Sequence, residues 1–315
     1  MNGRWLAAEL IDSLTLATRM IPQFATVALS DPQRQIDVLL DGPCALDVSV
    51  QTVAVSLDPL LIAVGVPATV DPAVLSDVRL VFRETAGERT ELARLDLRFR
   101  RALAIPGGEL AIFSPIGERD RCLRPHRLLL YYGWKRWYAR RRSDWRGSFD
   151  DFKRLLVYYV CPRPVALVSV MDDAERGNLF PMDLIASPFS GTFVAALKNT
   201  NRALECVRRS RRMVVSVVPY ELADQTRALA DMHRADHVDW STVPVALARS
   251  ACFAYPVPER ALTVTEIEVQ RTEDMGSHTA LIGVQVRRER LNEGRAMHHV
   301  SGLYQTHCRM EGHPL

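Results

Sequence analysis

Residues 162–218 read PRPVALVSVMDDAERGNLFPMDLIASPFSGTFVAALKNTNRALECVRRSRRMVVSVV. Short apolar runs alternate here with clusters of turn-forming residues, which is typical of strands joined by tight turns. One later segment instead has the apolar spacing of a helix. The stretch predicts strands at Ala166–Val170, Asn178–Ile185, Thr192–Leu197 and Met213–Val218, a turn at Asp172–Gly177, and a helix at Arg202–Arg209. It therefore indicates a β-hairpin, a third strand, a helix and a return strand.

The predicted helix begins just after Lys198, Asn199 and Thr200. Free backbone N–H groups at a helix start, together with the positive end of the helix dipole, favour a bound anion such as phosphate. Lys198 supplies a full charge, and the Asn199 amide and the Thr200 hydroxyl supply directional donors. Asn and Thr before a helix are also ordinary N-caps. Phosphate binding and simple capping both remain open from these residues alone.

Several separate motifs occur along the second half of the chain. They are PRPVALVSV at 162–170, NLFPMDL at 178–184, Ser187-Pro188, Lys198-Asn199-Thr200, GSHTALIGV at 276–284 and HHVSGLY at 298–304. Their order and spacing resemble the flavin-reductase-like family, and the resemblance covers about half the chain, from Tyr158 to Tyr304.

This resemblance implies a split β-barrel, usually a homodimer, that holds FMN in a groove formed partly across the dimer interface. It also implies hydride transfer from NADH or NADPH to the flavin, the cofactor carrying the chemistry while the protein positions it. His278 would stand near the ring edge as the candidate catalytic residue. The residues implied to lie along the isoalloxazine, largely through main-chain groups, are Ser169, Val170, Met171, Asn178, Phe180, Pro181, Met182 and Asp183. Those implied to hold the ribityl phosphate are Ser187, Lys198, Asn199 and Thr200.

Asp183 departs from the family pattern, in which many relatives have a small hydroxyl residue. A carboxylate beside a flavin would disfavour an anionic reduced ring. The chain also lacks a Gly-x-Gly-x-x-Gly fingerprint, so a nicotinamide would have to stack in the flavin groove. The alternative function is a non-enzymatic flavin-binding or sensor protein with a partner-binding N-terminal module. The electron acceptor and the choice between NADH and NADPH are not encoded in any motif.

The first third of the chain has a different pattern. From Phe24 to about Phe113, short stretches rich in Val, Ile and Leu alternate with polar residues and are broken by turn signals. In RLDLRFR at 94–100, Leu95, Leu97 and Phe99 are expected to face a core. We therefore expect a mainly β protein of three parts: a small all-β N-terminal domain at 1–123, a linker helix at 124–150, and the FMN-binding split barrel, with a few helices, at 151–315.

Residues 124–149, RPHRLLLYYGWKRWYARRRSDWRGSF, interleave aromatic and basic side chains. Such a stretch can stack on nucleic-acid bases or lie at a membrane surface. It can also be a connecting helix that buries Leu130, Trp134, Trp137 and Tyr138 on one face. We favour the helix and do not expect a nucleic-acid partner, because 40 Lys and Arg against 37 Asp and Glu leave a net charge of only +3.

The remaining composition is typical of a cytoplasmic two-domain protein of 315 residues. The six cysteines are scattered without zinc-like spacing, so we expect reduced thiols and no metal site. The first 20 residues carry Glu9 and Asp12 within an apolar stretch, which favours a short amphipathic helix over a signal peptide. No apolar run approaches the length of a membrane span.

Overall fold

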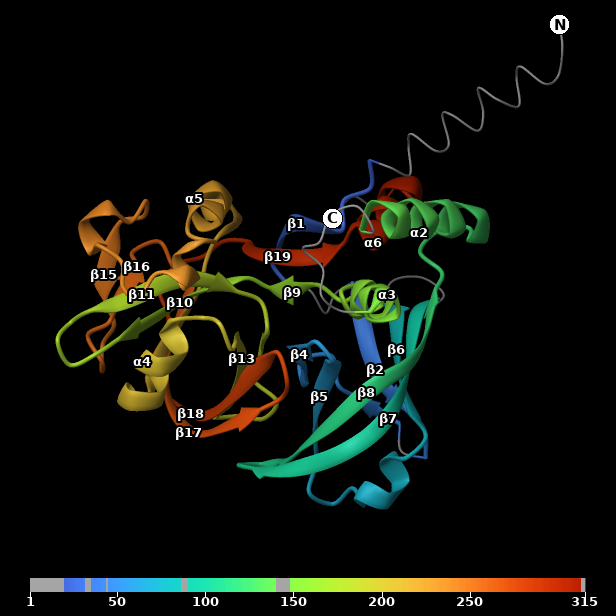
Figure 1. Cartoon of the computed structure of the whole chain (residues 1–315), viewed down its shortest axis with the longest axis horizontal. Helices are drawn as coiled ribbons and strands as arrows, with labels where there is room; N and C mark the ends of the chain where they lie inside the picture. Colours follow the sequence, from blue (N-terminus) through green and yellow to red (C-terminus); the bar gives the residue numbers. More distant parts are fainter. Residues whose placement is uncertain (1–19, 32–34, 44, 86–89, 140–147, 313–314) are drawn as a thin grey trace, which may run out of the picture.

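The computed structural model describes residues 20–31, 35–43, 45–85, 90–139, 148–312 and 315. The helix predicted near the N-terminus, Cys44 and the basic residues 140–147 lie outside the described residues. Two large antiparallel sheets lie side by side, and a smaller sheet lies along one end of both (Figure 1). The mainly β fold class expected from the sequence is confirmed.

The first sheet is built from residues 36–120 and has the strand order β3-β2-β6-β7-β8-β5-β4. Its longest strands form one hairpin, and Leu95 and Leu97 point into its core as the alternation predicts. Its elements are β2 (Ile36–Asp41), β3 (Leu46–Asp47), β4 (Thr52–Leu57), β5 (Leu60–Val66), the short 3-10 helix η2 (Pro72–Leu75), β6 (Val78–Glu84), β7 (Glu91–Ile105) and β8 (Gly108–Asp120).

The second sheet lies within residues 166–290 and has the strand order β11-β10-β14-β17-β18-β13-β12. Its strands and its one helix agree with those predicted in the 162–218 stretch, except that the predicted return strand Asn178–Ile185 is divided into two. Its elements are β10 (Ala166–Met171), β11 (Gly177–Met182), β12 (Ile185–Ala186), β13 (Thr192–Lys198), α4 (Ala203–Ser210), β14 (Arg212–Val217), β17 (Thr263–Asp274) and β18 (His278–Arg290).

An excursion between β14 and β17 covers one face of the second sheet. Its apolar side chains pack on Leu167 and Leu179, which alternate with the residues that face the interior of the curled sheet. The excursion comprises η3 (Tyr220–Leu222), α5 (Ala223–Ala228), η4 (Met232–Arg234), η5 (Trp240–Thr242), β15 (Leu247–Arg249) and β16 (Pro256–Pro258).

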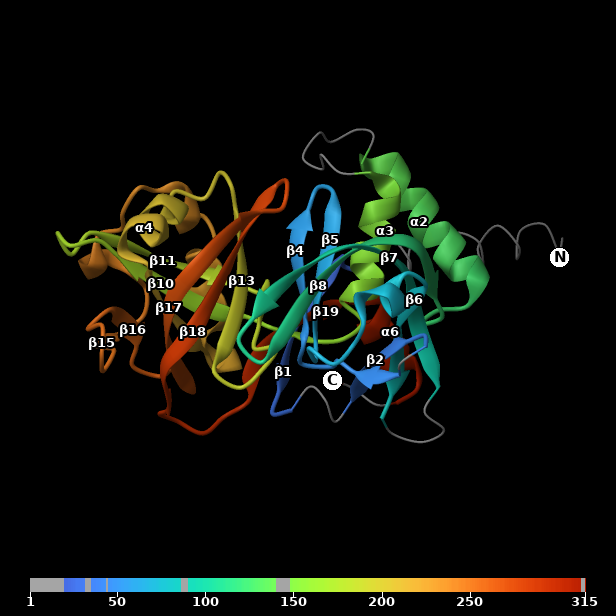
Figure 2. The same ribbon diagram turned by 90° about the horizontal axis from the view of Figure 1, so that it is seen from below.

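A three-stranded sheet joins the beginning of the chain to its end. Strand β1 (Phe24–Leu29) pairs with β19 (Ala296–Ser301), which also pairs with β9 (Arg163–Pro164). The N-terminal strand is thus hydrogen-bonded to the C-terminal part, with Phe24 opposite Ser301. Figure 2 shows the same two large sheets from below.

The remaining helices lie against the first sheet. Helix α3 (Phe149–Tyr158) packs on β7 and β8, and its Lys153 and Arg154 pair with Glu118. Helix α6 (Gly302–Met310) follows β19, and its His307 contacts the Cys122 carbonyl and Glu84. Elements on both sides of the expected boundary at residue 151 therefore contribute to the same packed unit.

Helix α2 (Pro125–Ala139) occupies much of the predicted linker, but its buried face differs from the expected one. Tyr131 is fully buried, whereas Leu130, Trp137 and Tyr138 are exposed. The predicted stripe is wrong because Tyr131, with the neighbouring Leu128 and Tyr132, packs on the core instead. None of the helices in the described ranges has the length and apolar character required to cross a membrane.

Candidate functional site

Three of the four predicted phosphate-binding residues, Lys198, Asn199 and Thr200, lie at the end of β13 and in the loop that leads to α4. Asn199 connects this loop to the turn between β17 and β18 through three hydrogen bonds. Its backbone N–H donates to the Ser277 carbonyl at 3.0 Å, and its Nδ2 donates to the Gly276 carbonyl at 2.7 Å. Its Oδ1 accepts from Thr279 Oγ1 at 2.8 Å. One Nδ2–H of Asn199 remains available to a ligand. The principal role of this side chain is therefore to fix the shape of the loop.

The start of α4 combines a cap with unpaired positive charge. Asn201 Oδ1 accepts from the Ala203 N–H at 2.9 Å, so a neutral amide caps the helix. Lys198 is exposed and makes no ion pair with any residue that the structure describes. An ammonium without a carboxylate partner at a helix start is a suitable counter-charge for a phosphate group.

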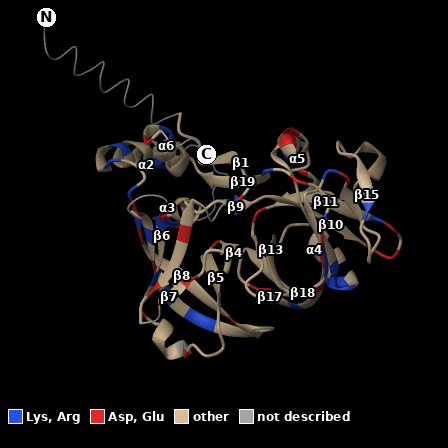
Figure 3. Cartoon of the chain, turned by 180° about the vertical axis from the view of Figure 1, so that it is seen from behind, with Lys and Arg blue, Asp and Glu red and all other residues tan. Residues whose placement is uncertain are grey.

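A surface pocket of about 360 Å³ lies at this helix start. Asn199 and Thr200 line it, whereas Lys198 is not among its lining residues, and the structure adds Arg202 and Arg208. Glu205 also lines the pocket, but lies within 3.8 Å of Arg209. Figure 3 shows basic residues gathered at α4. Sequence analysis did not identify these two arginines, because an Arg on a helix is usually solvated. The available signal was that Arg208 lies on the same helical face as Leu204 and Glu205.

His278 lies directly opposite Lys198 in the antiparallel pairing of β13 with β18. His278 as a whole is 6% exposed, and its Nδ1 lies 2.8 Å from Ser277 Oγ. Burial, together with the nearby Lys198 charge, lowers the pKa of His278 to about 4, while the charge of Asp183 opposes the shift. His278 is therefore a neutral hydrogen-bonding group at pH 7, and Lys198, His278 and Asp183 are close enough to influence one another.

This pKa shift predicts a pH-dependent loss of stability. An unfolded histidine takes up a proton near pH 6.5, whereas folded His278 resists protonation until about pH 4. Wild-type protein should therefore lose up to about 3 kcal/mol of unfolding free energy relative to His278→Gln as the pH falls from 7 to 4. Denaturant unfolding of both proteins at several pH values checks this, and a difference that stays constant with pH would contradict it.

Asp183 is held by two partners in the loop between β11 and β12. Tyr159 Oη donates to Asp183 Oδ2 at 2.8 Å, and His299 Nδ1 lies 2.8 Å from the same oxygen. Burial raises the pKa of this carboxyl, but His299 and Tyr159 outweigh burial, so the net shift is downward. Asp183 is therefore ionised at neutral pH. Its partner Tyr159 is itself held in place, because the Tyr159 ring packs against Phe24 with ring centroids 4.5 Å apart.

Sequence reasoning did not assign site roles to Tyr159 or His299. His299 was quoted only as part of a motif at the end of the chain, and its partner lies 116 positions away. The adjacent His298 faces the other way, is 3% exposed and contacts the Ala296 carbonyl. Neighbouring strand residues point to opposite faces, but the contact of His299 with Asp183 depends on tertiary structure.

Other candidate residues lie away from this cluster. The side chains of Val170, Phe180 and Met182 point into the apolar interior of the second sheet. Asn178 donates both Nδ2 hydrogens, to the carbonyls of Met232 and Ala235, at 2.7 and 2.9 Å. These four side chains therefore stabilise the fold, and contact with a ligand would have to involve main-chain atoms.

Three further candidates lie on the same two strands, β10 and β11. Ser169 is fully buried, and its Oγ has no hydrogen-bond partner among the described residues. The carbonyl of Met171 accepts from Tyr255 Oη at 2.9 Å. Pro181 is half-buried in β11, opposite Leu167. The structure does not bring these strand residues together with Lys198 through their side chains.

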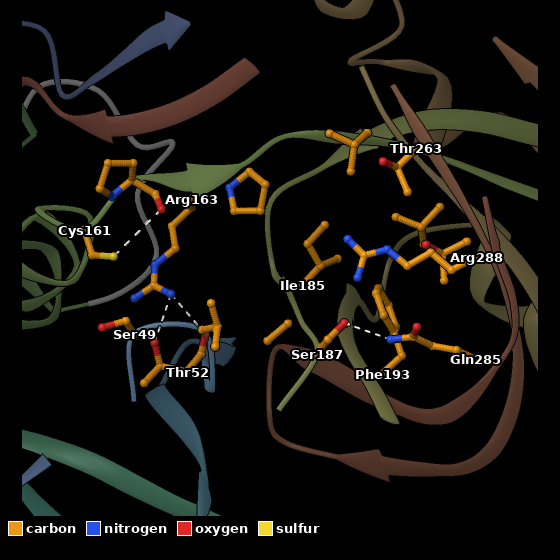
Figure 4. Close-up of a pocket in the computed structure, with 17 residues that line it drawn as sticks. Ser49, Thr52, Cys161, Arg163, Ile185, Ser187, Phe193, Thr263, Gln285 and Arg288 are labelled. Atoms are coloured by element: carbon orange, nitrogen blue, oxygen red, sulfur yellow. Dashed lines mark hydrogen bonds between the residues drawn. The ribbon is translucent and has the colours of Figure 1, made fainter. Parts of the chain in front are cut away.

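Ser187 lies in a different pocket, of about 400 Å³, between the two large sheets. Its Oγ accepts from Gln285 Nε2 at 3.1 Å. In Figure 4, Arg163 and Arg288 lie on opposite sides of this pocket. The Arg163 guanidinium donates to the carbonyl and hydroxyl of Thr52 and lies 3.9 Å from the Tyr158 ring centroid. Arg163 thus links β9 to the first sheet.

The residues around Lys198 fit the phosphate end of a flavin. Asn199 and Thr200 line the pocket at the start of α4 together with two arginines. Lys198 precedes them in the chain and adds an exposed ammonium that has no ion-pair partner among the described residues. Within the described parts of the chain, no group of three or more His, Cys, Asp and Glu is placed to hold a metal ion. The geometry thus shows a β protein with an exposed, positively charged loop next to a neutral histidine and an ionised aspartate.

Comparison with known proteins gives the class of this domain. Residues 158–307 match the family described as flavin reductase like domain. The chain therefore contains a flavin-reductase-like domain with a split-barrel fold, preceded by a β-rich N-terminal region. This agrees with the resemblance found in the sequence motifs. No curated protein matches the chain.

Solved structures similar to the chain include flavin reductases. The NADH:FAD oxidoreductase SgcE6 of Streptomyces globisporus C-1027 is 18% identical over 49% of this chain and 89% of its own, with a TM-score of 0.43. BorF, the flavin reductase component of a bacterial two-component tryptophan halogenase, is 19% identical over 49% and 95%, with a TM-score of 0.43. An FMN-binding protein from Thermus thermophilus is 21% identical over 41% and 72%, with a TM-score of 0.37.

Proposed function

We propose that this protein binds FMN beside Lys198 and reduces it with NADH or NADPH. The observation that carries the proposal is Lys198 at the end of β13, which has no ion-pair partner among the described residues and lies directly opposite His278 within a flavin-reductase-like domain. A bound flavin would supply the hydride-accepting chemistry. The cytoplasmic location remains a prediction from the composition. The homodimer is a prediction from the resemblance alone, and the arrangement of the two halves of the chain, described below, favours a single chain instead.

The chain's own residues would act by binding and by electrostatics. Lys198 and Thr200 would bind the phosphate, and Asn199 would keep their loop attached to the β17–β18 turn. Neutral His278 can donate or accept one hydrogen bond near the ring without adding charge. Asp183, held by Tyr159 and His299, would place a negative charge in the same region.

Anaerobic mixing tests the reductase activity. Protein loaded with FMN is mixed with NADH or NADPH under anaerobic conditions, and flavin absorbance is followed. We expect at least one donor to bleach the flavin faster than it bleaches free FMN at the same concentration. Binding without bleaching by either donor would overturn the reductase proposal while leaving flavin binding intact.

A second candidate function is flavin binding without reduction by a nicotinamide. Asp183 favours this alternative, because an ionised carboxylate disfavours a negatively charged reduced ring. Neither function needs a general acid–base triad. The two candidates share the same site and differ in the reduction potential that this site imposes.

Replacement of Asp183 tests how strongly its charge acts on the flavin. Asp183→Asn removes the negative charge while retaining a side chain of the same size, so the reduction potential of the bound flavin should rise. We expect a rise of tens of millivolts, since about 30 mV corresponds to about 1.4 kcal/mol in a two-electron couple. Spectroelectrochemistry of both proteins measures the change, with Asp224→Asn on α5 as the control. An unchanged potential would place Asp183 away from the ring.

A further inference from the structure

The two large sheets have the same topology. The strands of both sheets follow one another along the chain in the same spatial order. In each sheet a helical segment comes just before the strand that is third from one edge, namely η2 before β6 and α4 before β14. When the two strand orders are aligned, each element of the first sheet has a counterpart in the second. The pairs are β2 and β10, β3 and β11, β4 and β12, β5 and β13, η2 and α4, β6 and β14, β7 and β17, and β8 and β18. All seven strands correspond, and the excursion containing α5 is the main addition in the second sheet.

The contacts between the sheets follow the same correspondence. The β4–β5 turn of the first sheet meets the β17–β18 turn of the second: Asp58 N–H donates to Ser277 Oγ at 2.9 Å, and Ser277 N–H donates to the Asp58 carbonyl at 2.9 Å. The β12–β13 loop of the second sheet meets the β7–β8 turn of the first, where Thr192 Oγ1 donates to the Pro106 carbonyl at 2.8 Å. Each contact is the counterpart of the other.

Close packing accompanies these polar contacts. Phe189, in the β12–β13 loop, lies on Gly107 and Gly108, and a Cβ added at either glycine would come within 2.8 Å of the Phe189 side chain. On strands β13 and β18, Val194, Ala196, Ala280 and Ile282 face the first sheet and join its core. Their strand neighbours Phe193, Ala195, Leu197 and Leu281 face the opposite interior. Both faces of these strands are thus buried.

An interface in which each partner uses the same surface elements is the arrangement of a two-fold dimer. Here both partners belong to one chain, and β19 pairs with the corresponding strands β1 and β9 of the two halves. We propose that the N-terminal half is a second copy of the split barrel that occupies, within one chain, the place of a second subunit, and that it holds no flavin itself. The part concerning flavin rests on the proposed function.

The strand registers identify the counterpart of each site residue. Val66 pairs with Glu109, the second residue of β8, and Leu197 pairs with Thr279, the second residue of β18. Val66 therefore corresponds to Leu197, which makes Pro67 the counterpart of Lys198. Gly108 is likewise the counterpart of His278, since each begins its strand. The N-terminal half lacks both the ammonium and the imidazole.

The helix start in the N-terminal half also disfavours an anion. Asp71 Oδ1 accepts from the Ala73 N–H at 2.8 Å, whereas the corresponding cap in the second half is made by the neutral Asn201. A carboxylate at this position repels phosphate, whereas the neutral amide of Asn201 does not. Helix η2 spans only four residues, Pro72–Leu75. One flavin per chain is therefore expected rather than two.

Two measurements on the wild-type chain test the proposal. Size-exclusion chromatography with light scattering should give the mass of one chain, 35.5 kDa, with and without FMN. Equilibrium dialysis with FMN should give one bound flavin per chain. A mass of two chains, or two flavins per chain, would overturn the proposal. A single-chain mass without FMN binding would support the internal dimer and count against the proposed function.

A matched variant tests the unequal roles of the two halves. Pro67→Ala changes the counterpart of Lys198, and we expect its FMN affinity to stay within about twofold of the wild-type value. Its mass should also remain that of one chain. Loss of FMN affinity in Pro67→Ala tenfold or more, in protein with a wild-type circular dichroism spectrum, would show that the N-terminal loop binds flavin and would contradict the proposal.

Discussion

Lys198→Ala is expected to weaken FMN binding about ten- to a hundredfold, which corresponds to about 1.5–3 kcal/mol for a lost charge-assisted hydrogen bond. The ammonium of Lys198 is exposed and has no competing carboxylate among the described residues, so its full charge is available to a phosphate. The fold should not change, because the main-chain pairing of Lys198 with His278 does not depend on the side chain. Fluorescence titration with FMN measures the effect.

Arg227→Ala is the control for this substitution. It removes the same charge from α5, where Arg227 is exposed and pairs with Asp224 at 2.7 Å. We expect FMN affinity in Arg227→Ala to be close to the wild-type value. A second check is salt: the difference between Lys198→Ala and wild type should shrink as ionic strength rises, because exposed charges are screened. Equal affinity of Lys198→Ala and wild type would remove Lys198 from the site.

Gly302→Ala is expected to lower the free energy of unfolding by about 2–3 kcal/mol, since overpacking and lost hydrogen bonds both contribute. Gly302 lies at the junction of β19 and α6, and its N–H donates to the Gln23 carbonyl at 3.1 Å. A Cβ at this position would lie 1.9 Å from the Pro22 carbonyl oxygen. The backbone would have to separate where Phe24 pairs with Ser301.

Gly133→Ala is the matched control, because it adds the same methyl group where no atom lies within 4 Å of the new Cβ. Gly133 is exposed on α2, so the change should stabilise the protein by about 0.5–1 kcal/mol through helix propensity. Denaturant unfolding of both variants makes the comparison. If Gly302→Ala were as stable as wild type, the close packing of the chain's first strand against its last would be wrong.

Much of the second half could be predicted from local sequence. Runs such as Ala166–Val170 and Thr192–Leu197 are apolar enough to form buried strands, and the break at Lys198-Asn199-Thr200 precedes the helix that the structure contains. The return strand was predicted as one element, but it divides because Asp183 turns aside to contact Tyr159 and His299. Contacts between residues this distant leave no periodic signal.

The relation between the two halves could not be predicted in the same way. The counterparts of Lys198 and His278 are Pro67 and Gly108, so the residues that mark the motif are missing from the first copy. What the halves share is strand order, which emerges only when the sheets are formed. The prediction of the buried face of α2 was wrong for a related reason. Trp137 and Tyr131 are both suitable core residues, and only tertiary packing determines that Tyr131 is the buried one.

The central claim, that the flavin-reductase-like domain holds FMN at the Lys198 loop, is tested most directly by titrating purified protein with FMN and following flavin fluorescence and absorbance. The account predicts saturable binding of one FMN per chain, weakened at least tenfold in Lys198→Ala. Protein that is colourless as purified and shows no spectral change on addition of FMN would contradict it.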